Sequence, residues 1–565
     1  MKTSLLSLAL LALGGLFNSV PLPADAAPPP VTPGQGTWKV VGNSGVAAMH
    51  VFQSGPGKLV IVDKSESNPV KRANGLPGFS AEYDLKTNKF RVLDLGTNTF
   101  CSAGAYLGNG TLVETGGAEA DKGTQAKSGF QSIRLWQPCV DNKCNWKEYQ
   151  LYLSSARWYN TLTTLPDGRV FILSGCTSAT AINTVAYQNP TYEFFPKDNT
   201  PTGVPFDFLL KAFPYDLYPH VAVLPYGNRL FMFTGTKSCI WDYKTKKYIK
   251  SPESMPILKG PQRTYPTTGT GLLLPLTYEN NYRADFMMCG GGIKYGNTEL
   301  TADNTCGRID LSVANPKWDY DTFVIPRVMG DGVVLADGKV LFVNGAGKGY
   351  AGYTKGGAPN YKYLADNPVL TPLLYDPNPK TPKNKRWTKL ANSKIPRMYH
   401  SIANLIPDGT VLVTGSNPNG NYRKVDGVLK YPTEYRVEIF TPPYLLNKVP
   451  RPTLVEFAGV AKFNQLNPIR IGYGKTFTVK IKLPAGVKPE ITSSIINLGF
   501  QTHSIHMSQR YVKLEVTQVN GGNGGVWNVN IKMVPRNNVM PPGRNYVYVL
   551  HNGTPANTAV EIMLG

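Results

Sequence analysis

The chain has 565 residues and is rich in glycine, proline and tyrosine, and its 59 basic against 37 acidic residues give a net charge of +22. This length excludes a single ordinary hydrophobic core, and no long stretch has helical apolar periodicity, so we expect an all-β protein of two or more domains. The basic residues are scattered and form no recognition motif, so we expect no nucleic-acid partner. An anionic cell-wall polymer, an acidic substrate or a merely solvated basic surface explains the charge better.

The chain begins with a predicted secretory signal. Lys2 supplies the positive charge, Leu5 to Leu16 is apolar but too short to span a bilayer, and Ala24 to Ala26 has the pattern of a cleavage site. Residues 1–26 are therefore expected to be removed, and residues 27–35 form a short Pro-rich linker. We expect the mature protein to be secreted, extracellular, monomeric and without a membrane anchor. Two glycosylation sequons fit this expectation, at Asn109 and Asn552.

Secretion makes the seven cysteines candidates for disulfide bonds, and an odd number leaves at least one of them over. Spacing alone does not determine the connectivity. The candidate pairs are Cys139 with Cys144, Cys289 with Cys306, and Cys176 with Cys239. Cys101 stands apart from these pairs, and its simplest interpretation is a buried thiol.

A turn followed by an apolar strand and a closing glycine recurs seven times along the chain. The turns are separated by 53, 58, 60, 56, 54 and 71 residues, close to the period of about 50 that is typical of kelch repeats. Their third positions are Gly57, Gly110, Gly168, Asn228, Ala284, Gly338 and Gly409. Since one blade cannot bury both of its faces alone, residues 36–450 are predicted to form a seven-bladed kelch-type β-propeller.

After residue 450 the repeat stops and a different pattern begins. In KTFTVKIKL the apolar residues Phe477, Val479, Ile481 and Leu483 alternate with threonine and lysine, and YVKLEV and VWNVNIKMV alternate in the same way. Alternation with one polar face is typical of an antiparallel sandwich. Residues 451–565 are therefore predicted to form an immunoglobulin-like β-sandwich.

Two of the repeats share a longer motif. ARWYNTLTTLPDG carries Tyr159 and RMYHSIANLIPDG carries Tyr399, which precede their turn glycines by 9 and 10 residues. Nearly equivalent positions in two blades can point at the same axis. The alternative is that both tyrosines pack within their blades with satisfied hydroxyls.

The few histidines suggest what the tyrosines could bind. His400 follows Tyr399 directly, and His503 and His506 lie three apart in GFQTHSIHMSQR, on opposite sides of an extended segment, so only one of them is expected to be a ligand. Phenolate and imidazole together suit Cu(II) in tetragonal geometry. The set lacks the carboxylates of a calcium site and the thiolates of a structural zinc site.

The motifs, taken in order, resemble those of the copper radical oxidases, the family of galactose oxidase and glyoxal oxidase. The matching segments are FCSAGAYLGNGTLVETGG with Cys101, ARWYNTLTTLPDGRVF with Tyr159, RMYHSIANLIPDG with Tyr399 and His400, and FQTHSIHMSQR with His503. The segment YPTTGTGLLLPLTYENNYRADFMMCGGG is also similar to the glyoxal oxidase branch, which the chain resembles most.

The resemblance implies a site and an activity. One copper ion would be held by Tyr159, His400 and His503 in the equatorial plane and by Tyr399 as axial ligand and general base. Cys101 would be joined to the Tyr159 ring by a thioether, a protein-derived cofactor that holds a radical. The implied reaction is the oxidation of small aldehydes or α-hydroxy carbonyls, such as glyoxal or methylglyoxal, to acids, with reduction of O2 to H2O2. His503 would bring the C-terminal domain to the propeller channel.

Two departures from galactose oxidase bear on the substrate. The place of its radical-stacking tryptophan falls near Thr177, where SGCTSAT has no tryptophan, so the shielding group is left open. The short linker before residue 36 leaves no room for an N-terminal carbohydrate-binding domain. Both favour small aldehydes. The alternatives are a primary-alcohol or sugar oxidase of the same family, and a non-catalytic propeller that binds glycan or cell-wall polymer.

Overall fold

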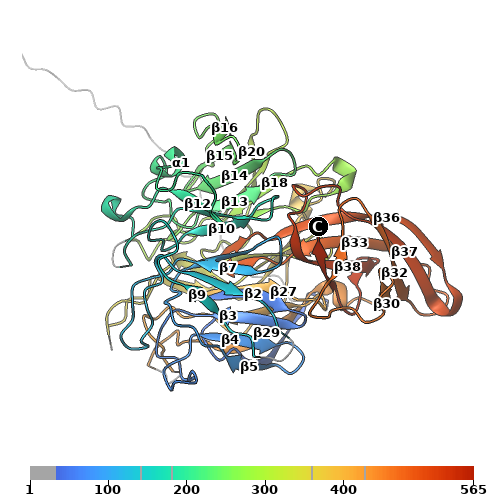
Figure 1. Cartoon of the computed structure of the whole chain (residues 1–565), viewed down its shortest axis with the longest axis horizontal. Coiled ribbons are helices and arrows are strands. Elements are labelled where there is room, and N and C mark those ends of the chain that lie inside the picture. Colours follow the sequence, from blue (N-terminus) through green and yellow to red (C-terminus); the bar gives the residue numbers. More distant parts are fainter. Residues whose placement is uncertain (1–33, 140–142, 180–181, 358–359, 425–427) are drawn as a thin grey trace, which may run out of the picture. The chain divides into compact units, whose positions relative to one another are not determined.

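The computed structural model describes residues 34–139, 143–179, 182–357, 360–424 and 428–565. The predicted signal 1–26 and most of the linker 27–35 lie outside the described residues. Almost all regular elements of the described chain are strands, which confirms the all-β prediction (Figure 1). Its helical segments are α1 (Asp207–Leu210) and the short 3-10 turns η1 (Val185–Tyr187), η2 (Tyr278–Asn280), η3 (Lys383–Lys385), η4 (Pro443–Leu445) and η5 (Asn523–Gly525). Within these described ranges, no helix has the length and apolar character needed to cross a bilayer.

Five antiparallel sheets of propeller type form from the repeats. The first three follow one another in the chain: β6–β9 (Ala103–Tyr106, Leu112–Thr115, Ile133–Trp136, Lys147–Tyr149), β10–β12 (Thr161–Thr164, Val170–Leu173, Tyr192–Phe195) and β13–β16 (His220–Val223, Arg229–Thr234, Lys237–Asp242, Lys247–Lys250). The fourth contains β21, β22, β25 and β26 (Asp331–Val334, Val340–Val343, Leu373–Tyr375, Trp387–Lys389). The fifth contains β27, β28, β29 and β1 (Ser401–Leu405, Val411–Gly415, Arg436–Thr441, Thr37–Asn43). A separate pair is formed by β23 (Ala346–Gly349) and β24 (Ala365–Pro368).

The repeat turns join the first two strands of these sheets. Gly168 lies in the β10–β11 turn with φ 82°, and Gly409 lies in the β27–β28 turn with φ 85°. Only glycine adopts this left-handed conformation without steric cost, which explains its recurrence in the motif. The N-terminal strand β1 pairs antiparallel with β29, so the two ends of the repeat region complete one sheet.

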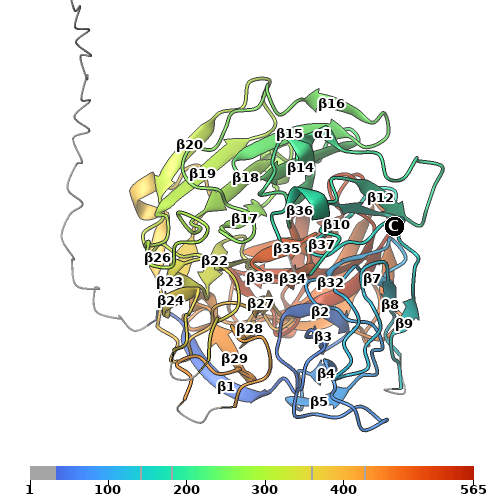
Figure 2. The same ribbon diagram turned by 90° about the vertical axis from the view of Figure 1, so that its left-hand side faces the viewer.

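A ten-stranded sheet links the remaining repeats to the C-terminal region. It contains β2–β5 (His50–Gly55, Lys58–Val62, Ser80–Asp84, Lys89–Val92) and β17–β20 (Thr270–Leu273, Asp285–Cys289, Thr305–Asp310, Trp318–Thr322). Between them lies the hairpin β34 (Phe500–Thr502) and β35 (Ile505–Met507), which pairs with β2 on one side and with β17 on the other. In Figure 2 this hairpin lies at the centre of the repeat strands.

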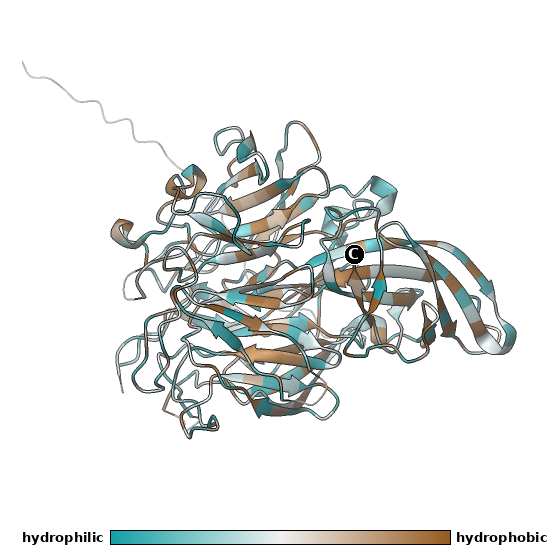
Figure 3. Ribbon diagram, viewed as in Figure 1, coloured by the Kyte–Doolittle hydropathy of each residue, from teal (hydrophilic) through white to brown (hydrophobic). Residues whose placement is uncertain are grey.

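The other C-terminal strands form a nine-stranded sheet. They are β30 (Thr453–Phe457), β31 (Ile469–Ile471), β32 (Thr476–Lys482), β33 (Ile491–Asn497), β36 (Arg510–Gly521), β37 (Val526–Lys532), β38 (Gly543–His551), β39 (Thr554–Pro555) and β40 (Val560–Leu564). Phe477, Val479 and Ile481 are buried while the residues between them are half-exposed, which confirms the predicted alternation. Figure 3 shows hydrophilic and hydrophobic residues alternating along the strands of this region.

Buried apolar contacts and hydrogen bonds join the C-terminal region to the repeats. Val333 and Leu335 share one buried cluster with Ile496 and Leu498. Within the hairpin, the buried Gln501 donates to the Asp331 carboxylate (2.8 Å) and accepts from the Ala403 backbone (2.9 Å). Because buried polar groups are stable when they are paired, these two bonds add to the strand pairing that holds the hairpin in place.

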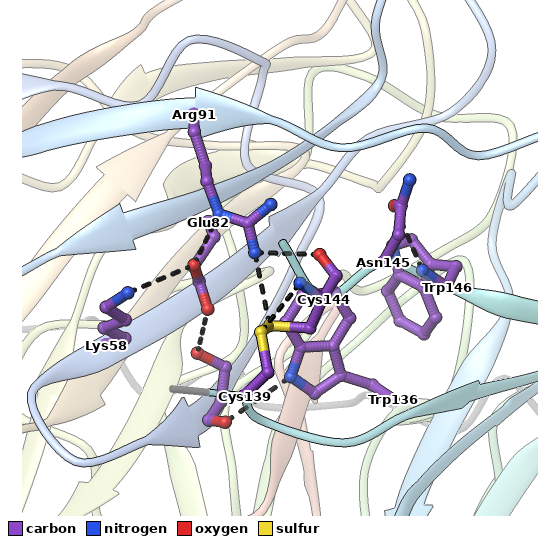
Figure 4. The surroundings of a disulfide bond; sticks show 9 residues. Lys58, Glu82, Arg91, Trp136, Cys139, Cys144, Asn145 and Trp146 are labelled. Atoms are coloured by element: carbon purple, nitrogen blue, oxygen red, sulfur yellow. Dashed lines mark hydrogen bonds and ion pairs between the residues drawn. A yellow bond between two sulfur atoms is a disulfide. The ribbon is translucent and has the colours of Figure 1, made fainter. Parts of the chain in front are cut away.

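Two of the three expected disulfides are present. Cys139 is bonded to Cys144 beside Arg91, which donates to the Cys144 carbonyl at 2.9 Å (Figure 4). Cys289 and Cys306 are bonded across the paired strands β18 and β19. The expected pairing of Cys176 with Cys239 is wrong. Their side chains are buried in two different clusters, and the Cys176 thiol donates to the Ser178 carbonyl at 3.2 Å.

Candidate metal centre

Three loops that lead into first strands end in a left-handed residue. Cys101 (φ 53°) precedes β6, Tyr159 (φ 63°) precedes β10, and His400 (φ 58°) precedes β27. Non-glycine residues rarely adopt this conformation, and such strain concentrates at functional sites. His503 (φ 46°) lies in the two-residue turn between β34 and β35, with Ser504 also left-handed (φ 65°), as a tight hairpin turn requires.

These positions bring all five predicted site residues together. The Tyr159 and Tyr399 hydroxyl oxygens lie 3.1 Å apart. His400 Nε2 lies 3.0 Å from His503 Nε2, which lies 3.2 Å from Cys101 Sγ. The five side chains have exposed fractions between 0% and 6%. Tyr159 is also tied to Cys101 through its backbone, since its N–H donates to the Cys101 carbonyl at 3.0 Å.

Buried arginines hold the two motif loops in place. Arg157 pairs with Glu193 on β12 and donates to the Ser174 carbonyl at 2.8 Å. Arg397 pairs with Glu438 on β29 and donates to the Gly415 carbonyl at 2.7 Å. Both ion pairs are desolvated and hydrogen-bonded to backbone, so each loop has one well-defined position.

The two motifs differ by one residue. His400 precedes Gly409 by 9 residues, as Tyr159 precedes Gly168, and both have the left-handed conformation. Counted from the turn glycine, the counterpart of Tyr159 is therefore His400, whereas counted from the preceding arginine it is Tyr399, in line with the nearly equivalent positions expected from the sequence. The extra residue lets Tyr399 and His400 both reach the axis from a single loop.

The electrostatics of the centre follow from burial. Burial lowers the pKa of His400 and His503 well below the usual imidazole value, so both rings are neutral. Burial also raises the pKa of the Tyr159 and Tyr399 hydroxyls. The Thr502 hydroxyl lies 2.5 Å from His503 Nδ1, which leaves Nε2 to face His400. Two neutral imidazoles beside two phenols fit a divalent copper ion, whose charge would favour ionised phenols.

His506, the other histidine of the hairpin segment, does not join the centre. It lies on β35, and its Nε2 is 2.5 Å from the Leu498 carbonyl.

A third tyrosine, not singled out from the sequence, lies within the centre. The Tyr159 hydroxyl donates to the Tyr265 hydroxyl at 2.8 Å, and Tyr265 lies 3.3 Å from the Tyr399 hydroxyl. The rings of Tyr159 and Tyr265 stack with centroids 4.2 Å apart. A sequence signal existed, because Arg157-Trp-Tyr159, Arg263-Thr-Tyr265 and Arg397-Met-Tyr399 repeat the same pattern.

Aromatic rings also cover Tyr159, but they come from residues other than the expected position near Thr177. The Trp158 ring lies 4.4 Å from the Tyr159 ring, and Phe100 packs edge-on against Trp158 at 5.3 Å. Thr177, near the expected place of a stacking group, is exposed and donates its N–H to the Tyr187 carbonyl at 2.8 Å.

The fold and this centre define a copper radical oxidase, an oxidoreductase, and comparison with known proteins agrees. Residues 62–444 match the family model described as glyoxal oxidase N-terminus, and residues 461–563 match the galactose oxidase-like Early set domain, an immunoglobulin-like domain. The chain belongs to the glyoxal oxidase family.

Curated relatives cover nearly the same length. "Aldehyde oxidase GLOX" from Vitis pseudoreticulata is 32% identical over 548 residues, 92% of this chain and 96% of the relative. "Aldehyde oxidase GLOX1" from Arabidopsis thaliana is 33% identical over 559 residues, 92% of this chain and 83% of the relative. A solved fungal alcohol oxidase of the AA5 family, in complex with copper, has the same fold with a TM-score of 0.70 at 17% identity, over 94% of this chain and 99% of that one.

Proposed function

We propose that this protein is a secreted copper radical oxidase that converts small aldehydes or α-hydroxy carbonyls, of the glyoxal and methylglyoxal type, to acids. The observation that carries the proposal is the convergence of Tyr159, Tyr399, His400, His503 and Cys101 in one buried centre. For an aldehyde hydrate the balance is RCH(OH)2 + O2 → RCOOH + H2O2.

Each residue has a role in this proposal. Tyr159, Tyr399, His400 and His503 hold one copper ion, which when bound supplies one-electron redox chemistry and acidifies a substrate hydroxyl. Tyr399 accepts the proton of that hydroxyl as general base, because the charge of a bound copper ion would favour its phenolate over the neutral phenol that burial alone favours. The Tyr159 ring, joined to Cys101 through a thioether, takes the hydrogen atom from the substrate carbon. The surrounding aromatic rings exclude water from this oxidised ring.

The finer architecture is part of the same proposal. We assign residues 36–450 to a seven-bladed propeller and residues 451–565 to the sandwich, after a signal peptide at 1–26. The number of seven blades is supported by the ten-stranded sheet. The inserted hairpin divides this sheet into β2–β5 and β17–β20, and these two four-stranded units add to the five separate sheets. We also propose that the net charge of +22 associates the secreted monomer with an anionic cell-wall polymer.

A substrate panel tests the proposed activity. Peroxide release from copper-loaded protein is expected to be at least about tenfold faster with glyoxal or methylglyoxal than with galactose or a simple primary alcohol, because the side chains of the centre are almost fully buried, which favours a small substrate, and the family resemblance favours aldehydes. The measurement is initial rate at matched concentrations. A clear preference for galactose or for the alcohol would contradict the assigned substrate class.

Trp158 is expected to protect the oxidised Tyr159 ring. Trp158→Phe should shorten the lifetime of the radical absorption by about tenfold, because a smaller ring covers Tyr159 less completely and admits water. Copper content should not change. The matched control is Trp241→Phe, which removes the same atoms from a separate buried cluster. Equal lifetimes in the two variants would show that Trp158 does not shield the radical.

A further inference from the structure

Tyr265 has no role in the proposed metal set, although it lies as near to the reacting groups as any ligand does. Its hydroxyl is 2.8 Å from that of Tyr159 and 3.3 Å from that of Tyr399. Its ring is buried and stacks on the Tyr159 ring at an interplanar angle of 24°. This third phenol therefore lies within hydrogen-bonding distance of both the group that takes the hydrogen atom and the group that takes the proton.

The Tyr265 hydroxyl is the candidate hydrogen-bond donor of the centre. A phenol has one O–H donor and two acceptor positions. In the structure Tyr159 donates to Tyr265, so the Tyr265 oxygen accepts, and the Tyr265 proton is directed either to the Tyr399 hydroxyl at 3.3 Å or to a bound molecule. Once Tyr159 and Tyr399 serve as ligands without their protons, Tyr265 is the phenol of the three that can still donate.

A second hydroxyl of the same segment faces the centre. The hydroxyl of Thr268 is buried and has no hydrogen-bond partner among the residues that the structure describes. Thr268 lines a cavity of about 10 Å³ together with Tyr399, His400 and His503. A buried polar group without a partner is costly, so a water molecule or a substrate oxygen is expected beside it.

Aldehyde hydrates differ from primary alcohols in one feature that the hydroxyls of Tyr265 and Thr268 can distinguish. A hydrate carries two hydroxyls on the reacting carbon, and a primary alcohol carries one. Tyr399 takes the proton of one hydroxyl in either case. We infer that Tyr265, together with Thr268 three residues later in the chain, binds the second hydroxyl of an aldehyde hydrate and thereby makes the centre selective for hydrated aldehydes over primary alcohols; this inference rests on the proposed function.

Two unreactive analogues measure this recognition without turnover. Trifluoroacetone hydrate has two hydroxyls on a carbon that carries no hydrogen, and trifluoro-tert-butanol has a methyl group in place of one of them. Titration calorimetry on copper-loaded protein should show that Tyr265→Phe weakens binding of the hydrate by about tenfold and binding of the alcohol by less than about twofold, the usual range for one lost hydrogen bond. Thr268→Val should shift the hydrate in the same direction by a smaller factor.

Steady-state kinetics make the same comparison between a hydrated aldehyde and a primary alcohol. Tyr265→Phe should lower kcat/KM for methylglyoxal by about tenfold and leave the slower oxidation of a primary alcohol within about twofold. The matched control is Tyr218→Phe. The Tyr218 ring packs edge-on against Tyr159 at 5.2 Å, but its hydroxyl donates to the Ser102 carbonyl, so both substrates should be affected equally or not at all.

The outcomes separate the inference from the proposed function. Equal losses for hydrate and alcohol in Tyr265→Phe, in binding and in turnover, would overturn the inference and leave Tyr265 as a support of the Tyr159 ring. A selective loss in Tyr218→Phe would overturn it as well. If the wild-type protein releases no peroxide from any substrate, the proposed function fails, and the calorimetric comparison alone then decides whether Tyr265 binds a geminal diol.

Discussion

Replacing His503 with asparagine is expected to lower copper affinity by more than about 100-fold and to abolish peroxide release. The loss of an outer partner of a ligand already costs about 10- to 100-fold, so the loss of a ligand itself should cost more. Asparagine is chosen because it tolerates the left-handed backbone (φ 46°) of this turn, so the hairpin should keep its shape. Copper per chain by elemental analysis and peroxide release are the two measurements.

His506→Asn is the matched control for this variant. It changes the same residue type in the same hairpin, but its Nε2 faces the Leu498 carbonyl and not the centre. Copper content and activity should both stay close to those of the wild type. If His506→Asn abolishes activity and His503→Asn does not, the two assignments must be exchanged.

Cys101→Ser is expected to lower oxidase activity by at least about 100-fold while copper still binds, because the four proposed ligands are unchanged and only the oxidation of Tyr159 becomes harder. Cys101 is buried, has no disulfide partner, and holds the backbone of Tyr159 through its carbonyl. In the proposed cross-link the S–H bond and one ortho C–H bond of Tyr159 break and an S–C bond forms. Two electrons and two protons pass to O2, which becomes H2O2.

Mass spectrometry tests the cross-link directly. Protein treated with copper in air should be lighter by two hydrogen atoms than protein prepared without copper, and a tryptic digest should contain one branched peptide with Cys101 and Tyr159. Cys239→Ser is the control, since Cys239 is a buried thiol in a separate cluster, and this variant should still lose two hydrogen atoms on copper treatment and keep its activity. Recovery of Cys101 as an alkylatable thiol from fully active protein would contradict this cofactor.

Features that depend on residues close together in the chain could be predicted from the sequence. The turn motif marks the first hairpin of each sheet because a left-handed turn residue such as Gly168 is required there whatever surrounds it. The alternation around Val479 identifies a half-buried strand because successive side chains point to opposite faces. The Cys139–Cys144 bond closes so short a loop that the backbone alone brings the sulfurs together.

Features that depend on distant segments were decided by the tertiary structure. The sequence placed His503 near a strand end, but its position in the centre arises because a hairpin from the C-terminal region pairs with β2 and β17. The predicted pairing of Cys176 with Cys239 is wrong because the two cysteines are buried in different clusters, and their spacing in the chain does not indicate this. Tyr265 was missed although it shares the Arg-x-Tyr pattern of the other two tyrosines.

The sequence by itself therefore determined the repeat and the sandwich pattern, because strand alternation and turn conformation are local properties of the backbone, whereas the candidate residues of the centre followed from the resemblance of their motifs to a known family. The tertiary structure decided which of these residues meet. Tyr159, Tyr265 and Tyr399 are 240 residues apart at most along the chain, yet their hydroxyls come within 3.3 Å, because loops from different sheets end at one axis and the hairpin carrying His503 fills it.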